Sequence, residues 1–265
     1  MSRLGHRFFV PFALELGSEV ELPESIARQA TRVLRLRPGD SIVLFDGRDL
    51  DFLAELQHVT HNAVRVSIRD AQPSRPLPPP PITLLQALLR HDHFELVVEK
   101  ATELGVVRIV PLRTQRSIVH LDTRSTEHRL QRWYRIAVEA SEQCGRGVLP
   151  IIDPPCDLVS ALERLRSQRL VALWEAHTAP PIAQDHFSAV EPLALAIGPE
   201  GGWTSDEIEL LSRSGADLRS LGPLILRSET AAIAGIAAVR ARTVVDPPAP
   251  ITCAAPDAPR ASAGG

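Results

Sequence analysis

The sequence has few cysteines and no long apolar run, and each shortage excludes a class of protein. Its three cysteines, Cys144, Cys156 and Cys253, show no metal-like spacing and form an odd set, which fits free thiols in a reducing cytosol better than a disulfide framework. No apolar run approaches the roughly 20 residues that cross a bilayer, and the N-terminus lacks the apolar core of a signal peptide. We therefore expect a cytoplasmic protein without a membrane partner.

The chain also lacks a basic excess, because its formal net charge is −3 and Lys100 is its only lysine. This balance disfavours a protein that coats nucleic acid indiscriminately. The net charge is still compatible with RNA binding, because phosphate contacts require a local cluster of basic residues and not a positive net charge of the whole chain. One candidate patch is Arg28, Arg32 and Arg35, which share a face if residues 24–35 form a helix. The alternative is a solvated helix face.

A proline-rich segment divides the chain. Residues 71–81 read Ala-Gln-Pro-Ser-Arg-Pro-Leu-Pro-Pro-Pro-Pro, and consecutive prolines favour extended polyproline II over helix or central strand. We expect a small β-barrel domain over residues 1–72, a semi-rigid linker over 73–81 and a second domain over 82–245. Residues 246–265 are rich in Pro, Ala, Ser and Gly, which predicts a disordered tail. The strands expected in the barrel are 7–10, 19–22, 41–45, 50–56 and 63–69.

Beyond the linker, apolar runs alternate with segments of helical pattern, which predicts a parallel α/β sheet. The predicted strands are 82–89, 107–112, 169–174, 193–197 and about 217–221. The predicted helices are 92–104, 126–143, 157–167, 205–213 and 229–243. His91 and His93 lie two residues apart at the start of the first of these helices, whereas metal-binding helices usually space histidines by four. We therefore expect exposed histidines there and no metal site.

Two segments of the second domain run from a short apolar strand through a Gly-Pro loop into a helix. In the first, Gly198-Pro199-Glu200-Gly201-Gly202 follows the predicted strand, and Thr204 and Glu207 have the spacing of a capping box. The second covers residues 221–231. Adjacent glycines let a ligand approach the main chain closely, and such loops at the carboxyl end of a sheet are typical of ligand sites. An ordinary tight turn is the alternative for Gly-Gly alone. Neither loop has the Lys-Ser/Thr pair of a P-loop, which disfavours a nucleotide hydrolase.

Further motifs lie along the chain. They are Arg7-Phe8-Phe9, Arg32-Val33-Leu34-Arg35-Leu36, Phe45-Asp46-Gly47, Glu99–Val106 and Glu142-Gln143-Cys144-Gly145-Arg146. Together with the two glycine loops, they resemble the ribosomal RNA small subunit methyltransferase E family over roughly residues 3–245. These SPOUT-class enzymes use S-adenosylmethionine to methylate N3 of a uridine in 16S rRNA.

The resemblance implies the fold, the partners and the cofactor site. It implies an α/β fold with a SPOUT-type trefoil-knotted parallel sheet and an N-terminal PUA-like β-barrel. It also implies a homodimer that acts on 16S rRNA or the small ribosomal subunit, with the cofactor pocket near the subunit interface. S-adenosylmethionine is expected at Leu173, Trp174, Ile197, Gly198, Pro199, Glu200, Gly201, Gly202, Leu221, Gly222, Leu224, Ile225, Leu226 and Thr230. RNA contacts are expected at Arg7, Arg28, Arg32, Arg35, Arg116 and Arg146.

Methyl transfer to N3 requires loss of the N3 proton, and much of the catalysis is positioning. A cation beside the base would stabilise the developing uridinate. Arg227 is the residue that we expect in this role, and Glu229 is a candidate base or a partner that holds an arginine. The alternative is that Arg227 and Glu229 form a structural ion pair that closes the loop. No dedicated base is evident in the sequence.

Two positions depart from the family pattern. Family members often carry His where Gln29 stands and Arg where Leu224 stands. The first change puts one barrel-side RNA contact in doubt, and the second removes a cation beside the cofactor loop. Neither change touches the glycine loops, so we expect cofactor binding to be kept. The alternatives to uridine-N3 methylation are a ribose 2′-O methyltransferase of the same superfamily and an RNA-binding or assembly protein without catalysis.

Overall fold

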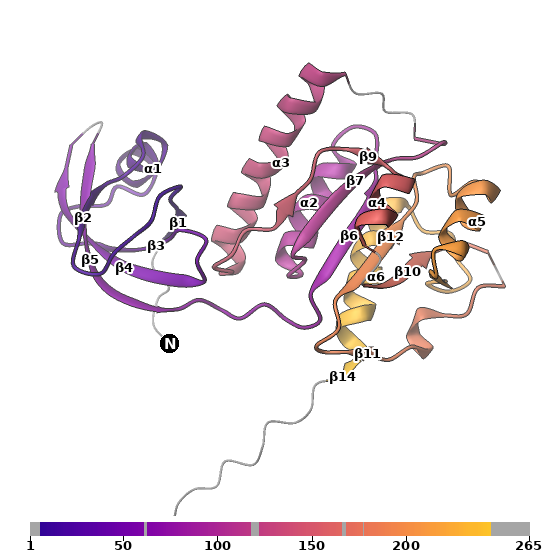
Figure 1. Ribbon diagram of the computed structural model, residues 1–265. Helices are drawn as coiled ribbons and strands as arrows, with labels where there is room; N and C mark the ends of the chain where they lie inside the picture. Colours follow the sequence, from indigo (N-terminus) through magenta and orange to yellow (C-terminus); the bar gives the residue numbers. More distant parts are fainter. Residues whose placement is uncertain (1–5, 61–62, 118–121, 166–167, 177, 245–265) are drawn as a thin grey trace, which may run out of the picture.

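The computed structural model describes residues 6–60, 63–117, 122–165, 168–176 and 178–244 of the chain. Figure 1 shows two bodies that lie side by side and are joined by one extended segment after β5. The first body contains a five-stranded sheet and the second a seven-stranded sheet. Within the described ranges, no helix has the length and apolar character needed to cross a membrane. The predicted tail over residues 246–265 lies outside the described residues.

The first sheet is mostly antiparallel. Its strands are β1 (Arg7–Phe9), β2 (Glu19–Glu21), β3 (Ser41–Phe45), β4 (Leu50–Val59) and β5 (Val64–Pro73). They lie in the order β1-β3-β4-β5-β2, with β1 and β3 parallel and the other pairs antiparallel. Phe52, Ala54 and Leu56 alternate along β4 and are all buried, which is the period-2 pattern of a strand with one face on a core. The predicted β-rich, PUA-like domain is confirmed.

The helix expected over residues 24–35 is shorter and less regular than predicted. It consists of α1 (Glu24–Arg28) and a π-helical turn, η1 (Gln29–Val33), after which Arg35 adopts a left-handed φ of 55°. Leu34 and Leu36 pack against the core of the domain, so the chain turns inward before β3. The prediction that Arg28, Arg32 and Arg35 share one helical face is therefore wrong.

The strand expected over residues 63–69 is longer than predicted. β5 continues to Pro73, which pairs with Leu50 at the last position of the strand. Proline is tolerated there because its missing N–H falls at the end of the ladder. The extended connection that leads to the second domain therefore begins after Pro73.

The second sheet is parallel throughout its described pairs. Its order is β13-β10-β12-β6-β7-β8, and β9 also pairs with β7. The strands are β6 (Ile82–Ala87), β7 (Arg108–Arg113), β8 (Ile151–Ile152), β9 (Cys156–Asp157), β10 (Arg169–Leu173), β12 (Leu193–Ile197) and β13 (Asp217–Arg219). All the residues of β6 and β12 are buried, as expected for strands covered on both faces. The predicted parallel α/β sheet is confirmed.

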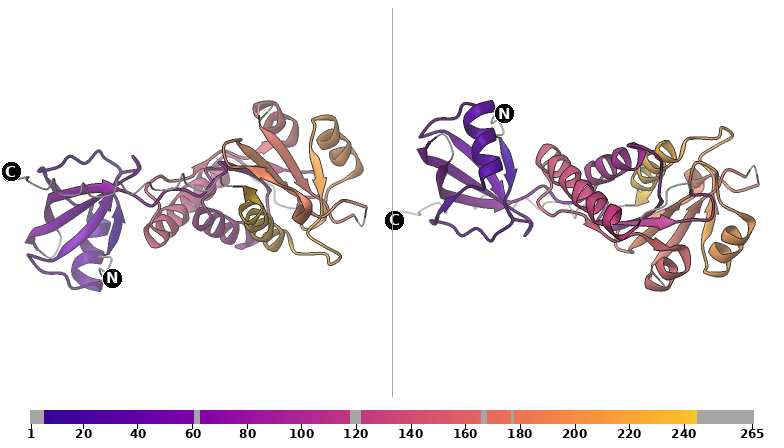
Figure 2. Two further views of the ribbon diagram at one scale, coloured as in Figure 1. Left: turned by 90° about the horizontal axis from the view of Figure 1, so that it is seen from below. Right: turned by 90° about the horizontal axis from the view of Figure 1, so that it is seen from above.

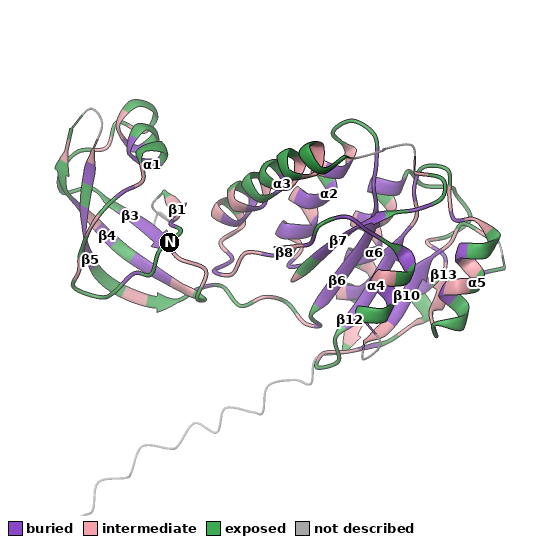
Figure 3. Ribbon diagram, turned by 45° about the horizontal axis from the view of Figure 1, so that its top comes forward, coloured by how far each residue is buried: buried purple, intermediate pink, exposed green. Residues whose placement is uncertain are grey.

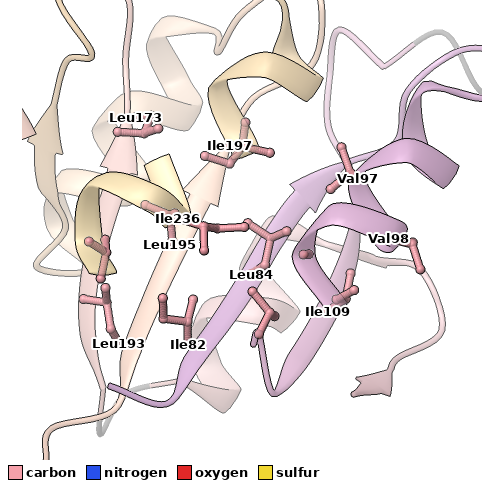
Figure 4. Close-up of a cluster of buried hydrophobic side chains, with 14 of the residues drawn as sticks. Ile82, Leu84, Val97, Val98, Ile109, Leu173, Leu193, Leu195, Ile197 and Ile236 are labelled. Atoms are coloured by element: carbon pink, nitrogen blue, oxygen red, sulfur yellow. The ribbon is translucent and has the colours of Figure 1, made fainter. Parts of the chain in front are cut away.

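Helices cover both faces of this sheet, as Figure 2 shows. On one face lie α2 (His93–Glu103), α3 (Thr123–Cys144) and α6 (Ser228–Ala241); on the other lie α4 (Leu158–Arg164) and α5 (Ser205–Arg213). Figure 3 shows the buried strands between them and the exposed outer side of α3. Figure 4 shows Leu84, Leu195 and Ile236 within the core on the α2, α3 and α6 side.

The connection between β10 and β12 lies against the C-terminal segment at several points. Its Pro181 forms a β-bridge with Ser220, its short helix η2 (Ile182–Gln184) contacts α6, and its strand β11 (Phe187–Ser188) pairs with β14 (Thr243–Val244). The chain from Ser220 to Val244 therefore runs alongside this connection before and after α6. The trefoil knot that the resemblance implies stays a prediction.

Candidate active site

Three loops leave the carboxyl ends of neighbouring strands of the second sheet. Leu173 at the end of β10 is in register with Ile197 at the end of β12 and with Arg219 at the end of β13. Parallel strands end at the same edge of a sheet, so the loops that follow them converge. They surround a cavity of about 400 Å³, within the range of roughly 300–1,000 Å³ that is usual for small-molecule sites.

Most of the residues predicted to bind the cofactor line this cavity. They are Leu173, Trp174, Ile197, Gly198, Pro199, Glu200, Gly202, Leu221, Gly222, Leu224, Ile225 and Leu226. The predicted catalytic residues, Arg227 and Glu229, also line it. The wall also contains His93, Glu175, Trp203, Ser228 and Ala231. Gly201 and Thr230 are not part of the wall.

Buried hydrogen bonds hold the first glycine loop. The Ser228 hydroxyl donates to the Gly198 carbonyl oxygen at 2.5 Å and accepts from Nε2 of Gln86 at 3.0 Å. The Trp203 indole donates to the Leu173 carbonyl oxygen at 3.0 Å. A Cβ atom on Gly198 would lie 3.1 Å from the indole nitrogen, so the close approach of this ring explains the glycine. The loop is thus anchored to β6, β10 and α6.

The helix after the loop begins as predicted. The Thr204 side chain accepts from the Glu207 amide, and the Glu207 side chain accepts from the Thr204 amide, so the predicted capping box is confirmed. Oε1 of Glu207 also accepts from the Gln115 amide at 2.8 Å. The carboxylate therefore fixes both the start of α5 and the loop after β7.

Gly201 and Gly202 serve different contacts. A Cβ atom on Gly201 would lie 3.2 Å from the Cβ atom of Arg116, whose guanidinium donates to the Gly201 carbonyl oxygen at 2.9 Å. Gly202 has a φ of +69°, and a Cβ atom there would lie 2.4 Å from Oε1 of Glu175. Close approach at Gly201 thus serves Arg116, and a contact between Gly201 and the cofactor stays a prediction.

The two isoleucines of the predicted cofactor site differ in exposure. Ile197 is 2% exposed, whereas Ile225 and its neighbour Leu224 are 80% and 77% exposed. Glu200, on the opposite loop, accepts a hydrogen bond from the Arg90 amide at 3.0 Å. This contact ties the loop after β12 to the segment between β6 and α2.

Arg227 and Glu229 are not joined by an ion pair. Arg227 is the exposed N-cap residue of α6, and within the part of the chain that the structure describes it makes no salt bridge. Glu229 is 7% exposed, and its Oε2 lies 3.7 Å from Nδ1 of His93. The alternative of a structural Arg227–Glu229 pair is therefore not observed. His93, expected to be an exposed residue at a helix start, instead lies in the cavity wall.

Two of the arginines predicted to contact RNA are buried, so these predictions are wrong. The Arg7 side chain is 6% exposed and forms a 2.7 Å ion pair with Asp51. It also donates to the carbonyl oxygens of Ser141 and Arg146, both at 2.8 Å. Arg7 thus joins the first domain to the end of α3 in the second domain, and its charge is not available to a phosphate.

Arg146 is 3% exposed. Its guanidinium donates to the carbonyl oxygens of Thr102 and Val106, both at 2.9 Å, and of Val148 at 2.6 Å. Burial lowers the pKa of Arg146 to about 10. Its role is to bind main-chain acceptors around the C-terminal end of α2.

The other arginines in the predicted RNA set are exposed. Arg116 lies beside the cavity and donates to the carbonyl oxygens of Gly201 and Trp203. Arg28 pairs with Glu24 on the surface of α1. Arg32 and Arg35 also lie on the surface of the first domain. A role for these four residues in RNA binding stays a prediction.

Comparison with known families matches both parts of the chain. Residues 76–240 match the RNA methyltransferase domain, and residues 23–69 match the RNA methyltransferase PUA domain. Ribosomal RNA small subunit methyltransferase E of Rickettsia conorii is 32% identical over 238 residues, which cover 89% of this chain and 95% of that protein. The protein of the same name from Bacillus subtilis is 30% identical over 220 residues, 80% of this chain and 85% of that one.

Solved structures show the same architecture. A methyltransferase structure from Legionella pneumophila, in complex with the bound cofactor SAM, has a TM-score of 0.82 and 31% identity, covering 90% of this chain and 98% of that one. Ribosomal RNA small subunit methyltransferase E from Neisseria gonorrhoeae, bound to S-adenosyl methionine, has a TM-score of 0.82 and 31% identity, covering 89% and 97%. The similarity therefore extends over both domains.

Proposed function

The chain belongs to the ribosomal RNA small subunit methyltransferase E family, and on that premise we propose that it transfers a methyl group from S-adenosylmethionine to N3 of a specific uridine in 16S rRNA. The relatives solved with this cofactor support the proposal. The proposed domains are an RNA-binding domain over residues 1–72 and a catalytic domain over 82–245, joined by residues 73–81.

The cavity at the ends of β10, β12 and β13 is the observation that carries this proposal. Its volume of about 400 Å³ suits one small molecule. Ile197, Ile225 and Leu226 give it an apolar side for the adenine ring, and the main chain of the three loops offers donors and acceptors. Glu175 and Glu229 add carboxylates to a wall that would face a cationic ligand. The residues present therefore fit S-adenosylmethionine, which when bound supplies a methyl group on a positively charged sulfur.

Arg227 is the residue that we assign to the charge that develops on the base. It lies in the cavity wall at the N-terminus of α6, and the N-terminal end of a helix adds a positive partial charge. Its guanidinium makes no salt bridge within the described residues and can turn toward a bound nucleotide. A donor held in place before reaction stabilises a developing anion most effectively.

A second copy of the chain is the partner that we propose for the exposed loop beside the cavity. Leu224 and Ile225 expose 77% and 80% of their surfaces, and exposed apolar groups that adjoin a binding site are typical of interaction surfaces. In a homodimer, the second copy would cover this loop and complete the cofactor pocket. Sedimentation velocity should show a dimer that an Ile225→Asp variant weakens; a wild-type monomer at micromolar concentration would contradict this arrangement.

Mapping of the modified nucleotide tests the proposed function. RNA from cells with and without this protein should differ by one N3-methylated uridine in the small-subunit rRNA. Calorimetry with the purified chain should show binding of S-adenosylmethionine. A ribose 2′-O-methyl nucleotide in place of the base modification would show a different specificity, and absence of cofactor binding would indicate an RNA-binding protein without catalysis.

A further inference from the structure

His93 and Glu229 bring two buried polar atoms face to face in the cavity wall. Nδ1 of His93 lies 3.7 Å from Oε2 of Glu229. Within the described residues, neither atom has a hydrogen-bond partner. Buried polar atoms are nearly always hydrogen-bonded, so an unpartnered pair needs an explanation.

The position of the imidazole connects the buried carboxylate with the cavity. His93 is the first residue of α2, Glu229 is the second residue of α6, and the two helices pack against each other. The His93 side chain is 34% exposed although its Nδ1 is buried. Nε2 is therefore the accessible nitrogen, and it lies on the same cavity wall as Arg227.

We propose that His93 is the general base that removes the N3 proton of the target uridine and that Glu229 positions it. This inference rests on the proposed function. Glu229 accepts a hydrogen bond from Nδ1–H, which leaves Nε2 as the acceptor on the cavity side. The distance of 3.7 Å is longer than a hydrogen bond, but catalytic hydrogen bonds are often long without substrate and shorten in the complex.

The step balances with the groups that the proposed function supplies. The N3–H bond breaks and its proton passes to Nε2 of His93. The N3 electron pair forms the bond to the methyl carbon, and the pair of the broken carbon–sulfur bond stays on sulfur. Arg227 offsets the negative charge on the base during the transfer, and the imidazolium then releases its proton to water.

An imidazole suits this task better than the nearby carboxylates. A general base is most effective when it titrates near the working pH, and an imidazole does so, whereas a carboxylate is a weak base toward a weakly acidic N–H. Glu200 already accepts a hydrogen bond from the Arg90 amide. Glu229 is 7% exposed, and its Oε2 faces Nδ1 of His93.

Charged groups on α2, α3, α6 and the cavity loops line either this cavity or the adjoining groove between α2, α3 and α6. Several of them are paired: Glu95 with Arg132, and Lys100 with Glu99 and Glu103. The remaining charged or titratable groups that line the cavity or the groove are Asp92, Glu139, Glu175, Glu200 and Arg227, and the ring of His91 lies 6.4 Å from that of His93. These groups are the same in the wild type and in the His93 variants. A difference between the pH profiles of their methylation rates therefore reports on His93.

Single-turnover methylation at saturating RNA and cofactor, measured from about pH 5 to pH 8, tests the base. The wild-type rate should rise with pH through one ionisation. His93→Gln should lower the rate by about 10²–10⁴ and remove that ionisation. His93→Ala should regain activity when imidazole is added, because a free base can enter the vacated space. His91→Asn is the matched control and should behave as wild type, because His91 is exposed and lies outside the cavity wall.

The tautomer of His93 gives a readout that does not depend on turnover. Nitrogen-15 NMR of the protein without RNA should show the proton on Nδ1, and Glu229→Leu should move it to Nε2. A proton on Nε2 in the wild type would overturn the positioning role of Glu229. A His93→Gln variant with normal melting temperature, rate and pH profile would overturn the catalytic role. If the wild type makes no 3-methyluridine while it binds the cofactor, the proposed function itself fails.

Discussion

The Ser228 hydroxyl donates to the Gly198 carbonyl oxygen at 2.5 Å and so fastens the first turn of α6 to the glycine loop after β12. Ser228 is 6% exposed, and Gln86 on β6 donates to the same hydroxyl. Two segments of the cavity wall, thirty positions apart in the chain, are thus held in one geometry by one side chain. The pre-formed shape of the cavity depends on this contact.

Ser228→Ala should weaken cofactor binding and lower stability. It removes the donor to the Gly198 carbonyl oxygen and one acceptor of the Gln86 amide, which keeps its bond to the Ala87 carbonyl oxygen. An unsatisfied buried group costs about 1–3 kcal/mol. We expect the melting temperature to fall by about 2–4 °C for each kcal/mol of unfolding free energy that is lost. The cofactor affinity should fall roughly tenfold for each 1.4 kcal/mol of binding free energy that is lost. Calorimetry checks the affinity, with exposed Ser212→Ala as control. Equal affinity in the two variants would show that the contact does not shape the site.

Gly235→Ala should destabilise the protein, although alanine favours helices. At an exposed helical position this change stabilises by about 1 kcal/mol. At Gly235, however, the new Cβ atom would lie 2.7 Å from Cδ1 of Leu173 and 3.3 Å from Cδ2 of Leu195, so either these buried side chains or α6 would have to shift. Overpacking of this kind costs about 1–3 kcal/mol. Urea unfolding shows whether the substitution lowers or raises the free energy of unfolding. A stabilised Gly235→Ala variant would contradict the close packing.

Glu142→Gln should change how stability depends on pH. Burial raises the pKa of Glu142, Glu139 raises it further, and the hydrogen bond from the Phe9 amide and the charge of Arg7 oppose this. The folded state therefore holds its proton to a higher pH than the unfolded state, and stability falls as pH rises from the usual carboxyl range through the raised value.

This loss should be absent from Glu142→Gln, so the variant should gain stability relative to the wild type between acid and neutral pH. Glu127→Gln, at an exposed position of the same helix, should show no such gain. Urea unfolding as a function of pH measures the difference. A constant difference across the range would contradict the burial of the Glu142 charge.

The salt dependence of RNA binding should separate surface arginines from buried ones. A triple change of Arg28, Arg32 and Arg35 to Gln should reduce the slope of log K against log[salt] by about 2, since each lost phosphate contact on a single strand removes about 0.7. Arg7→Met should lower stability and leave the slope unchanged, because Arg7 is bound to Asp51 and to α3. Fluorescence anisotropy at several salt concentrations checks both, and a reduced slope in Arg7→Met would restore its role in RNA binding.

Arg227→Ala should lower turnover far more than it lowers cofactor affinity. A donor of this kind contributes roughly 10²–10³ in rate, and Arg227→Lys should recover only part, because lysine lacks the planar fork. The melting temperature should hardly change, since Arg227 is exposed and makes no salt bridge within the described residues. Single-turnover rates with cofactor affinities provide the check; a large loss of melting temperature with normal turnover would favour a structural role.

Local features of the site could be predicted from the sequence, and long-range ones could not. The strand, glycine loop and capping box around Thr204 lie within one continuous segment, so their geometry follows from neighbouring residues. His93 reaches the cavity only because α2 packs beside α6, and no local pattern marks it. Arg7 resembled a surface cation until the contact between the domains showed its burial.

The central claim is that this chain methylates N3 of a uridine in small-subunit rRNA from a cofactor bound in the cavity beside Arg227. Incubation of the purified protein with unmethylated small-subunit RNA and S-adenosylmethionine carrying a deuterated methyl group, followed by nucleoside mass spectrometry, tests it most directly. The account predicts labelled 3-methyluridine, and far less of it with Arg227→Ala at equal cofactor binding. Label in a ribose 2′-O-methyl nucleoside, or none despite a bound cofactor, would contradict it.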